Sequence, residues 1–159
     1  VPSLADAAAL VRDAGRVLRL EVKADRDGRP YPGIVARCAA VLDATAMRGR
    51  TVFMSFQPLS VMEAHQLGGF LRSVLLLEAR PWRGMGAEGA IALCAVCGAA
   101  ELGLPIGEWD DRGVAALRGA GLGVSAWGTN DASTIRRGLD LGMDAIATDD
   151  PPLALRLRG

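Results

Sequence analysis

Residues 51–78 have the sequence TVFMSFQPLSVMEAHQLGGFLRSVLLLE, and this stretch decides the fold class. Residues 51–56 are a short run of β-branched, apolar and aromatic residues, as in buried strands. Pro58 can begin a helix that ends at Gly68-Gly69, and residues 73–78 form a second apolar run. A strand, a helix and a second strand in this order predict a parallel pair joined by a crossover helix.

The same alternation continues on both sides of this stretch. Strands are expected at 17–23, 51–56, 73–78, 100–104, 123–127 and 145–148. Helices are expected at 3–14, 33–47, 58–67, 87–97, 111–117, 131–141 and 151–157. Apolar strands that alternate with helices predict an α/β fold with a parallel sheet covered by helices.

Two architectures fit this pattern: an open doubly wound sheet and a TIM-type (β/α)8 barrel. A barrel needs about 250 residues and eight βα units. The 159 residues hold six units, which fits a single incomplete barrel domain over 1–159 with its first two units missing. The start at Val1-Pro2-Ser3-Leu4 is typical of a loop that enters a helix rather than of a natural terminus.

The composition limits the classes of partner that this protein is expected to bind. Lys plus Arg and Asp plus Glu both number 18, and this neutral balance argues against nucleic acid as the main partner. No apolar run reaches the length of a membrane span. Three cysteines are too few and odd in number for a disulfide scaffold, and Cys94 and Cys97 lie in an Ala-rich helical run as small buried residues. With no signal-peptide pattern, we expect a cytoplasmic protein.

Candidate site residues lie where strands end, because parallel α/β folds bind ligands beyond the carboxyl ends of their strands. Arg19, Glu21 and Lys23 are spaced by two, so they share one face of their strand, while Leu18 and Leu20 take the other. Charges that point inward must be paired or must bind a ligand. A structural ion pair is the alternative interpretation.

Two further strand ends carry candidates. Ser55 beside Phe56 could line a pocket, although ordinary packing is the alternative. Trp127 could form the floor of a pocket and Asn130 could orient a loop, or Trp127 could pack under the next helix. Thr148-Asp149-Asp150 ends the last strand, and one of these aspartates can cap the final helix.

Two other features favour a structural role. His65, the only histidine, lies inside a predicted helix with no partner at catalytic or metal spacing. Residues 84–89, GMGAEG, match the G-x-G-x-x-G pattern of dinucleotide sites, with Glu108 at the range of the ribose-binding acid. Residues 80–83 separate these glycines from the strand, where a dinucleotide site needs a tight turn.

Together these pieces resemble the glycerophosphodiester phosphodiesterase family, in order and spacing over essentially the whole chain. Two motifs lie at strand ends in the first half of the chain: E-x-K at Glu21 and Lys23, and Ser-Phe at Ser55 and Phe56. Two more lie near the C-terminal end: a W-T-V-N segment matched by Trp127-Gly128-Thr129-Asn130, and G-x-D-x-I-x-T-D-x-P at Gly142 to Pro151. The family's I-P-T-L lead-in to a helix is matched by Val1 to Leu4. Gly128 and Thr129 depart from the family's Thr and Val.

The resemblance implies a TIM-type barrel that hydrolyses glycerophosphodiesters to an alcohol and glycerol 3-phosphate, a reaction of lipid and glycerol metabolism. It implies Mg²⁺ or Ca²⁺ as cofactor with Glu21 as a metal ligand, and Lys23 as the catalytic cation that neutralises phosphate charge. It also implies that substrate-binding positions are Ser55, Phe56, Trp127 and Asn130.

The family's His-Arg, E-x-D and H-D motifs are absent from this sequence. His65 cannot replace the two acid–base histidines, because its segment matches the helix after Ser55-Phe56. We therefore expect the parent enzyme to be active and this chain alone to be inactive. The alternatives are a non-catalytic truncated barrel that covers its open sheet edges with a second copy or another chain and, resting on residues 84–89, a dinucleotide-binding enzyme.

Overall fold

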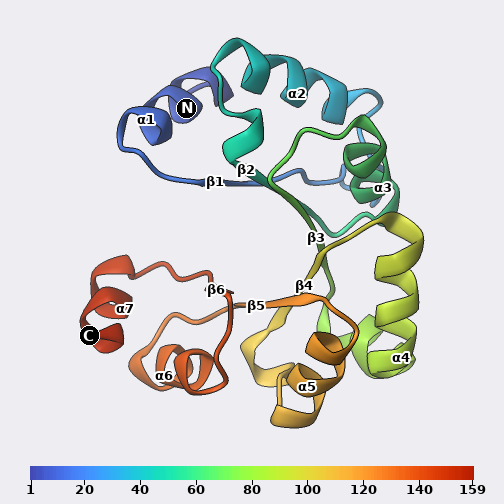
Figure 1. The fold of residues 1–159 in the computed structure, drawn as a ribbon, viewed down its shortest axis with the longest axis vertical. Coiled ribbons are helices and arrows are strands. Elements are labelled where there is room, and N and C mark those ends of the chain that lie inside the picture. The colour runs from blue at the N-terminus through green and yellow to red at the C-terminus, as the bar shows by residue number, and fades with distance from the viewer. The chain divides into compact units, whose positions relative to one another are not determined.

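The computed structural model of the chain describes residues 1–159 and contains two compact units. The first consists of Val1–Leu75 with Ala95–Ala99, and the second of Leu76–Cys94 with Ala100–Gly159. In each unit, helices alternate with parallel strands whose order follows the chain (Figure 1). The predicted βα alternation is therefore confirmed in both.

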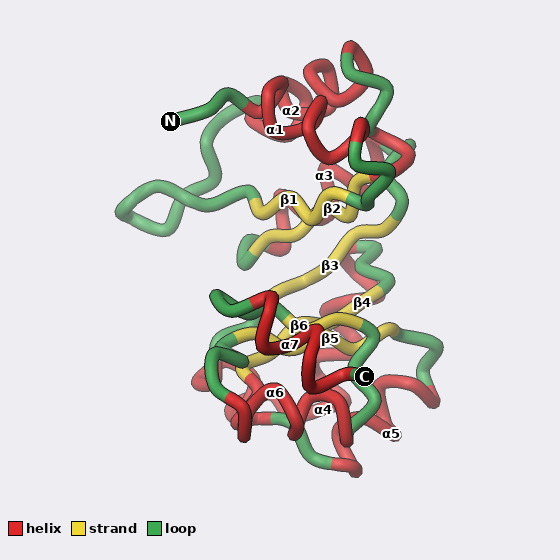
Figure 2. Tube along the Cα trace, turned by 90° about the vertical axis from the view of Figure 1, so that its left-hand side faces the viewer, coloured by secondary structure: helices red, strands yellow, loops and turns green.

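The first unit carries three strands. Its elements are α1 (Leu4–Asp13), β1 (Leu18–Glu21), α2 (Ile34–Ala44), the 3-10 turn η1 (Arg48–Arg50), β2 (Thr51–Ser55), α3 (Pro58–Leu67) and β3 (Arg72–Leu76), whose last residue belongs to the second unit. The strands pair in parallel, with Leu20 opposite Phe53 and Phe53 opposite Ser73. Figure 2 shows β1 and β2 side by side as the chain runs from one to the other through α2.

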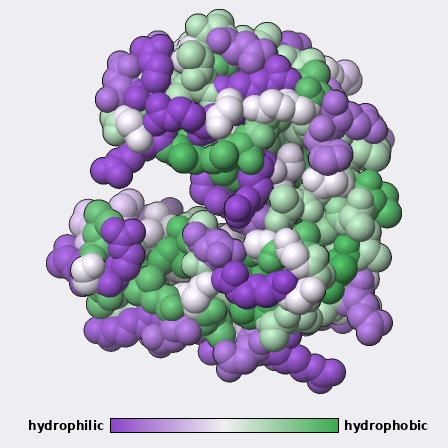
Figure 3. Space-filling view, in the orientation of Figure 1, coloured by the Kyte–Doolittle hydropathy of each residue, from purple (hydrophilic) through white to green (hydrophobic).

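The core of the first unit forms where helices cover this sheet. Ala8, Leu42 and Met47 are fully buried, and Leu18 and Leu20 pack against them. The predicted division of β1 into an apolar face and a charged face is thus confirmed. The helices expose polar residues on their other side, and Figure 3 shows hydrophilic and hydrophobic residues mixed over α1 and α2.

The second unit carries the remaining strands. Its elements are α4 (Ala79–Cys97, whose last three residues lie in the first unit), β4 (Glu101–Pro105), the 3-10 turn η2 (Ile106–Glu108), α5 (Asp111–Gly119), β5 (Gly123–Trp127), α6 (Ala132–Asp140), β6 (Ala145–Ile146) and α7 (Pro151–Arg158). Leu102 lies opposite Val124 and Ala126 opposite Ile146, both in parallel register. Three aspartates cap the helices by accepting backbone N–H bonds: Asp110, Asp131 and Asp150.

The helix after β3 departs from expectation. Residues 80–83 were expected between the strand and the helix, but α4 already begins at Ala79. Pro81 is tolerated there because the first turn of a helix leaves its N–H groups unbonded. Gly86 interrupts the helix with a φ of 65° and ψ of −173°, so that α4 consists of two helical segments.

The single histidine has a packing role. The ring of His65 on α3 lies over Gly98, where a β-carbon would fall 2.2 Å from its Cγ atom. Gly98 also has a φ of 70°, a backbone conformation that glycine adopts without strain. His65 is an exposed residue whose ring packs on Gly98, and its structural role stays a prediction. No helix of this chain combines the length and the apolar character needed to cross a bilayer.

Candidate active site

Glu21 and Lys23 form an ion pair where β1 ends. The Lys23 Nζ atom donates to Glu21 Oε1 at 2.7 Å. The side chain of Lys23 is 76% exposed and that of Glu21 is 27% exposed. The period-two spacing predicted that these two residues share a face, and the contact confirms it. The ammonium group thus stays accessible to an anionic ligand while the carboxylate fixes one of its hydrogen bonds.

The loop that follows Lys23 is organised by an aspartate that the sequence interpretation did not single out. Asp25 Oδ1 accepts hydrogen bonds from the backbone N–H groups of Asp27 and Arg29, at 2.9 and 2.8 Å. Ala24 and Pro30 form an antiparallel bridge at the base of this loop. The sequence Asp25-Arg26-Asp27-Gly28 contains the Asp-Gly turn signal, which could have indicated this loop.

Ser55 ends β2 with a side chain that has no exposed surface. Its hydroxyl donates to the Val22 carbonyl oxygen at 2.7 Å and accepts from the Gln57 N–H at 3.1 Å. Both hydrogen bonds are made within the protein and none is directed to solvent. Phe56, the next residue, is half-buried at the start of the loop into α3.

The ends of β5 and β6 are held together by side-chain hydrogen bonds. The Asn130 amide donates to Asp149 Oδ2 at 2.8 Å, and the Asp149 N–H donates to Asn130 Oδ1 at 2.9 Å. The buried Thr129 hydroxyl donates to the Ala147 carbonyl oxygen at 2.7 Å. Trp127 is half-buried at the end of β5. These hydrogen bonds connect the loop after β5 to the segment after β6.

The two aspartates that follow β6 form different hydrogen bonds. Asp149 bonds Asn130, while Asp150 caps α7 by accepting from the Leu153 N–H at 3.0 Å. The sequence predicted that one of the pair caps the helix, which is confirmed. It did not predict that the other aspartate holds Asn130.

The predicted site residues thus fall into two sets. Glu21, Lys23, Ser55 and Phe56 lie in the first unit, and Trp127 and Asn130 lie in the second. The residues of the first set lie at the ends of the neighbouring strands β1 and β2, and both residues of the second set lie at the end of β5. A common substrate site for the two sets stays a prediction.

The described residues do not fit a metal ion by themselves. No group of three or more His, Cys, Asp or Glu side chains is arranged to hold one anywhere in residues 1–159. Glu21 is the only candidate ligand, and one of its oxygens already accepts from Lys23. Mg²⁺ and Ca²⁺ take six or more oxygen ligands, so this carboxylate alone does not make a site.

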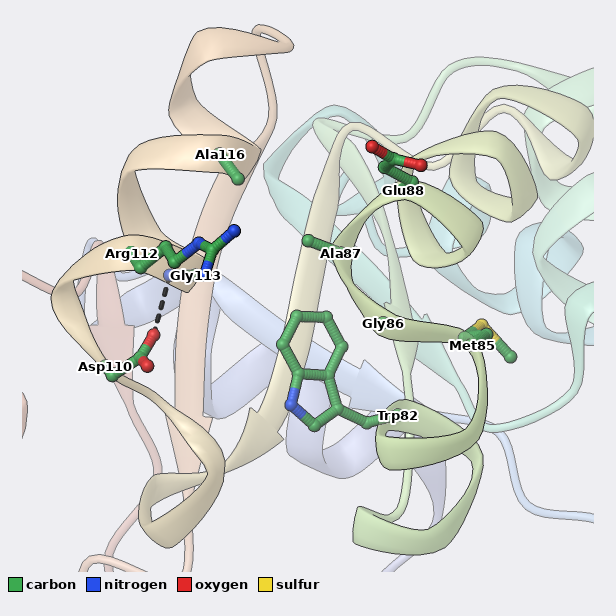
Figure 4. Close-up of a pocket in the computed structure, with 9 residues that line it drawn as sticks. All are labelled: Trp82, Met85, Gly86, Ala87, Glu88, Asp110, Arg112, Gly113 and Ala116. Carbon is green, nitrogen blue, oxygen red and sulfur yellow. Dashed lines mark hydrogen bonds between the residues drawn. The ribbon is translucent and has the colours of Figure 1, made fainter.

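A pocket of about 470 Å³ lies in the second unit, between the two segments of α4 and the start of α5 (Figure 4). Trp82, Gly86 and Glu88 line one side, and Asp110 and Arg112 line the other. None of the site residues implied by the family resemblance takes part, whereas residues 85–88 of the glycine pattern do. Asp110 caps α5 by accepting from the Gly113 N–H at 2.7 Å, which fixes the first turn of that helix beside the pocket.

The glycine pattern at this pocket does not have the form of a dinucleotide site. Gly84 and Gly89 lie within α4 rather than in a turn between strand and helix. Glu108, the candidate ribose-binding acid, instead forms two hydrogen bonds with the Arg83 guanidinium. These bonds lower the pKa of Glu108 and raise the pKa of Arg83. The geometry therefore does not favour the dinucleotide interpretation.

The model of the glycerophosphoryl diester phosphodiesterase family matches residues 1–153. The chain belongs to this family. No curated protein matches it in sequence. The family resemblance predicted from the ordered motifs is confirmed.

Solved structures agree with this family. A protein from Agrobacterium tumefaciens that is assigned as a glycerophosphoryl diester phosphodiesterase is 31% identical, with a TM-score of 0.94 over 99% of this chain and 63% of that chain. A similarly assigned protein from Silicibacter pomeroyi is 25% identical, with a TM-score of 0.85 over 99% of this chain and 56% of that one. A phosphodiesterase from Oleispira antarctica, in complex with the product sn-glycerol-3-phosphate, is 21% identical, with a TM-score of 0.79 over 98% and 60%.

This phosphodiesterase-family chain spans about three fifths of the length of these structures. The predicted fold class is confirmed: the chain is α/β, with the parallel strands and covering helices of an incomplete TIM-type barrel. That residues 1–159 form a single domain stays a prediction.

Proposed function

We propose that this chain is the part of a glycerophosphodiester phosphodiesterase that carries the E-x-K strand and the last strands of the barrel. The proposed enzyme hydrolyses a glycerophosphodiester to an alcohol and glycerol 3-phosphate. The observation that carries the proposal is the family match over residues 1–153. The sn-glycerol-3-phosphate in the Oleispira antarctica structure supports the choice of product.

The roles of individual residues follow from their chemistry. The Lys23 ammonium stabilises the negative charge that develops on the phosphoryl oxygens, and its exposure leaves it open to substrate. Phe56 and Trp127 are half-buried aromatic residues at strand ends, suited to the glycerol or alcohol part of the substrate. Asn130 orients the loop after β5 through Asp149.

The metal is a separate part of the proposal. A bound Mg²⁺ or Ca²⁺ would polarise the phosphoryl group, with Glu21 as one of its ligands. Further carboxylates from outside these residues would have to complete its coordination, so we assign no step to the metal. A cytoplasmic location also stays a prediction from the sequence.

The test is hydrolysis of glycerophosphocholine in the presence of Mg²⁺ or Ca²⁺. We compare this chain with a longer chain that includes two upstream βα units. We expect activity in the longer chain only, because the described residues hold no histidine other than His65 to act as acid and base. Activity in neither chain would favour the non-catalytic barrel, and activity in this chain alone would contradict the proposed mechanism.

In the active chain, Lys23→Ala should lower kcat about hundredfold or more, because it removes a cation that stabilises the transition state. The matched control is Arg16→Ala, which removes an exposed basic side chain just before the opposite end of β1. Equal losses in the two variants would show that the effect is general electrostatics and would contradict the role of Lys23.

A further inference from the structure

Ser55 has the geometry of a support rather than of a substrate contact. The side chain is fully buried, and its hydroxyl makes one hydrogen bond as donor and one as acceptor within the protein. The only donor of this hydroxyl is used by the Val22 carbonyl, and the side chain has no exposed surface through which a ligand could reach the remaining lone pair. Its effect on the reaction must therefore pass through the groups that it holds.

One of these groups is the peptide between Val22 and Lys23, whose carbonyl oxygen is that of Val22. The backbone ladder between β1 and β2 ends with the Val22 N–H, which donates to the Met54 carbonyl at 2.9 Å. The carbonyl oxygen of the same residue accepts from the Ser55 hydroxyl at 2.7 Å. Val22 is only 5% exposed, and the peptide groups before and after it each form one hydrogen bond with β2, the second of them through the Ser55 hydroxyl. The direction in which Lys23 leaves the strand depends on the orientation of this peptide.

We infer that Ser55 is a positioning residue that keeps Lys23 on Glu21 by anchoring the Val22–Lys23 peptide, and that it does not touch the substrate. The inference rests on the proposed function, in which Lys23 acts on the phosphoryl group. The same hydroxyl accepts from the Gln57 N–H, so it also fixes the turn that carries Phe56 into α3. One buried side chain is thus hydrogen-bonded to the backbone at the ends of both β1 and β2.

The chain offers a matched control at the other end of the same strand. Thr51 is also fully buried, and its hydroxyl donates to the Met47 carbonyl oxygen at 2.8 Å. Thr51→Val removes this hydrogen bond without changing the volume of the side chain. The variant therefore measures the loss of stability and activity that comes from removing any buried hydroxyl from β2. Thr51 lies four residues before Ser55, at the end of β2 that is far from Lys23.

The experiment is a double-mutant cycle in the full-length enzyme with glycerophosphocholine as substrate. We expect Ser55→Ala to lower kcat about tenfold to hundredfold, since small displacements of a catalytic group have effects of this size. In a Lys23→Met background, the same Ser55→Ala change should alter kcat by less than about twofold, because the group it positions is gone. Thr51→Val should leave kcat within about twofold, and Ser55→Thr, which keeps the hydroxyl, should restore most of the activity.

A second measurement does not depend on activity. The ¹³C shift of the Glu21 carboxyl group should move in Ser55→Ala toward its value in Lys23→Met, and should stay unchanged in Thr51→Val. If the wild-type enzyme does not hydrolyse the substrate, the proposed function fails, and the carboxyl shift still decides whether Ser55 holds the pair. If Ser55→Ala does not fold, Ser55→Cys replaces it, since a thiol keeps a similar volume with a weak donor only.

The inference is overturned by any of three results. The effects of Ser55→Ala and Lys23→Met on kcat could be fully additive, Thr51→Val could lower kcat as much as Ser55→Ala, or the Glu21 carboxyl shift could stay at its wild-type value in Ser55→Ala.

Discussion

Lys23 keeps 76% of its side chain exposed while its ammonium lies 2.7 Å from Glu21. Exposed ion pairs of this kind contribute little to stability, about 0–1 kcal/mol. The Glu21–Lys23 pair is therefore better explained by a role in the proposed reaction than by a contribution to the stability of the fold. A cation at the end of a strand is available to a phosphoryl group only because it is not enclosed by the core.

This distinction can be measured. We predict that Lys23→Met changes the free energy of unfolding by less than about 1 kcal/mol, because the charge is mostly solvated in both the folded and the unfolded state. Urea unfolding of the wild type and the variant at neutral pH gives the value. A loss above about 2 kcal/mol would show that the pair is structural.

Gly98 and His65 are a residue pair in which a packing contact is expected to contribute to stability. Gly98→Ala should destabilise the chain by more than the 1–2 kcal/mol or so of a left-handed alanine, because the new β-carbon also meets the His65 ring. Gly15→Ala is the control, since its φ of 67° is similar and nothing lies within 4 Å.

Thermal unfolding of these two variants, and of Gly98→Ala combined with His65→Ala, separates the backbone strain from the clash. Removing the ring should recover the part of the loss that Gly15→Ala does not show. Equal losses in Gly98→Ala and Gly15→Ala would contradict the proposed contact.

At this scale the sequence predicted some side chains and missed others for a physical reason. Glu21 and Lys23 could be placed on one face because strand periodicity fixes alternate directions. The partners of Ser55 and Asn130 could not be predicted, because a hydroxyl or amide binds whatever group tertiary structure brings near. Ser55 therefore remained a candidate substrate contact until its two hydrogen bonds within the protein were seen.

Among the elements, α6 shows how one acidic residue sets a helix start. Asp131 accepts from the Ser133 and Thr134 N–H groups, and the Thr134 hydroxyl accepts from the Asp131 N–H. The hydrogen bonds from Ser133, first of all from its side chain, and from Thr134 lower the pKa of Asp131 below its usual value of 3.8. A lowered pKa in the folded state means that this contribution to stability is present above pH 3.8 and is lost as pH falls through the folded value.

We predict that the Tm of the wild type falls more steeply below about pH 4 than that of Asp131→Asn. Asparagine keeps a capping oxygen but has no charge to lose, so the titrating part of the stability disappears. Thermal scans between pH 7 and pH 3 measure the difference. Parallel Tm profiles for the two proteins would contradict the assignment.

The helix α4 shows where element prediction failed. Pro81, Gly84 and Gly86 in a short stretch are typical of a loop, and the sequence interpretation left residues 80–83 outside the helix. In the structure, Pro81 occupies the first turn and only Gly86 leaves the helical conformation. A composition rule could not distinguish a helix with one break from a loop, because both use the same residues.

For the whole molecule, the alternation of strands and helices was enough to predict a parallel sheet covered by helices, but not the order of its strands. It could not decide between an open sheet and a barrel, since both architectures use the same βα unit. The ordered motifs suggested the barrel, and the likeness to solved structures confirmed it. The division of the chain into two compact units had no signal in the sequence.

In the first unit β1 pairs only with β2, and in the second unit β6 pairs only with β5. A strand with only one neighbour presents backbone groups that can pair with another chain. We predict that the weight-average mass of this chain, measured by sedimentation equilibrium, rises with protein concentration. The mass of a chain extended by two upstream βα units should stay at the value of a monomer. A constant monomer mass for both chains would contradict self-association through these strands.

The reciprocal bonds between Asn130 and Asp149 also bear on how this barrel can be recombined. The Asn130 side chain supplies a donor and an acceptor, while Asp149 accepts through its carboxylate and donates through its backbone N–H, so replacing either side chain breaks at least one of the two hydrogen bonds. A chimera assembled from two family members should therefore tolerate a crossover before β5 or after α7 better than one between them. We therefore expect the last two βα units to be exchanged best as one segment. In family members, the residues at positions 130 and 149 should change together.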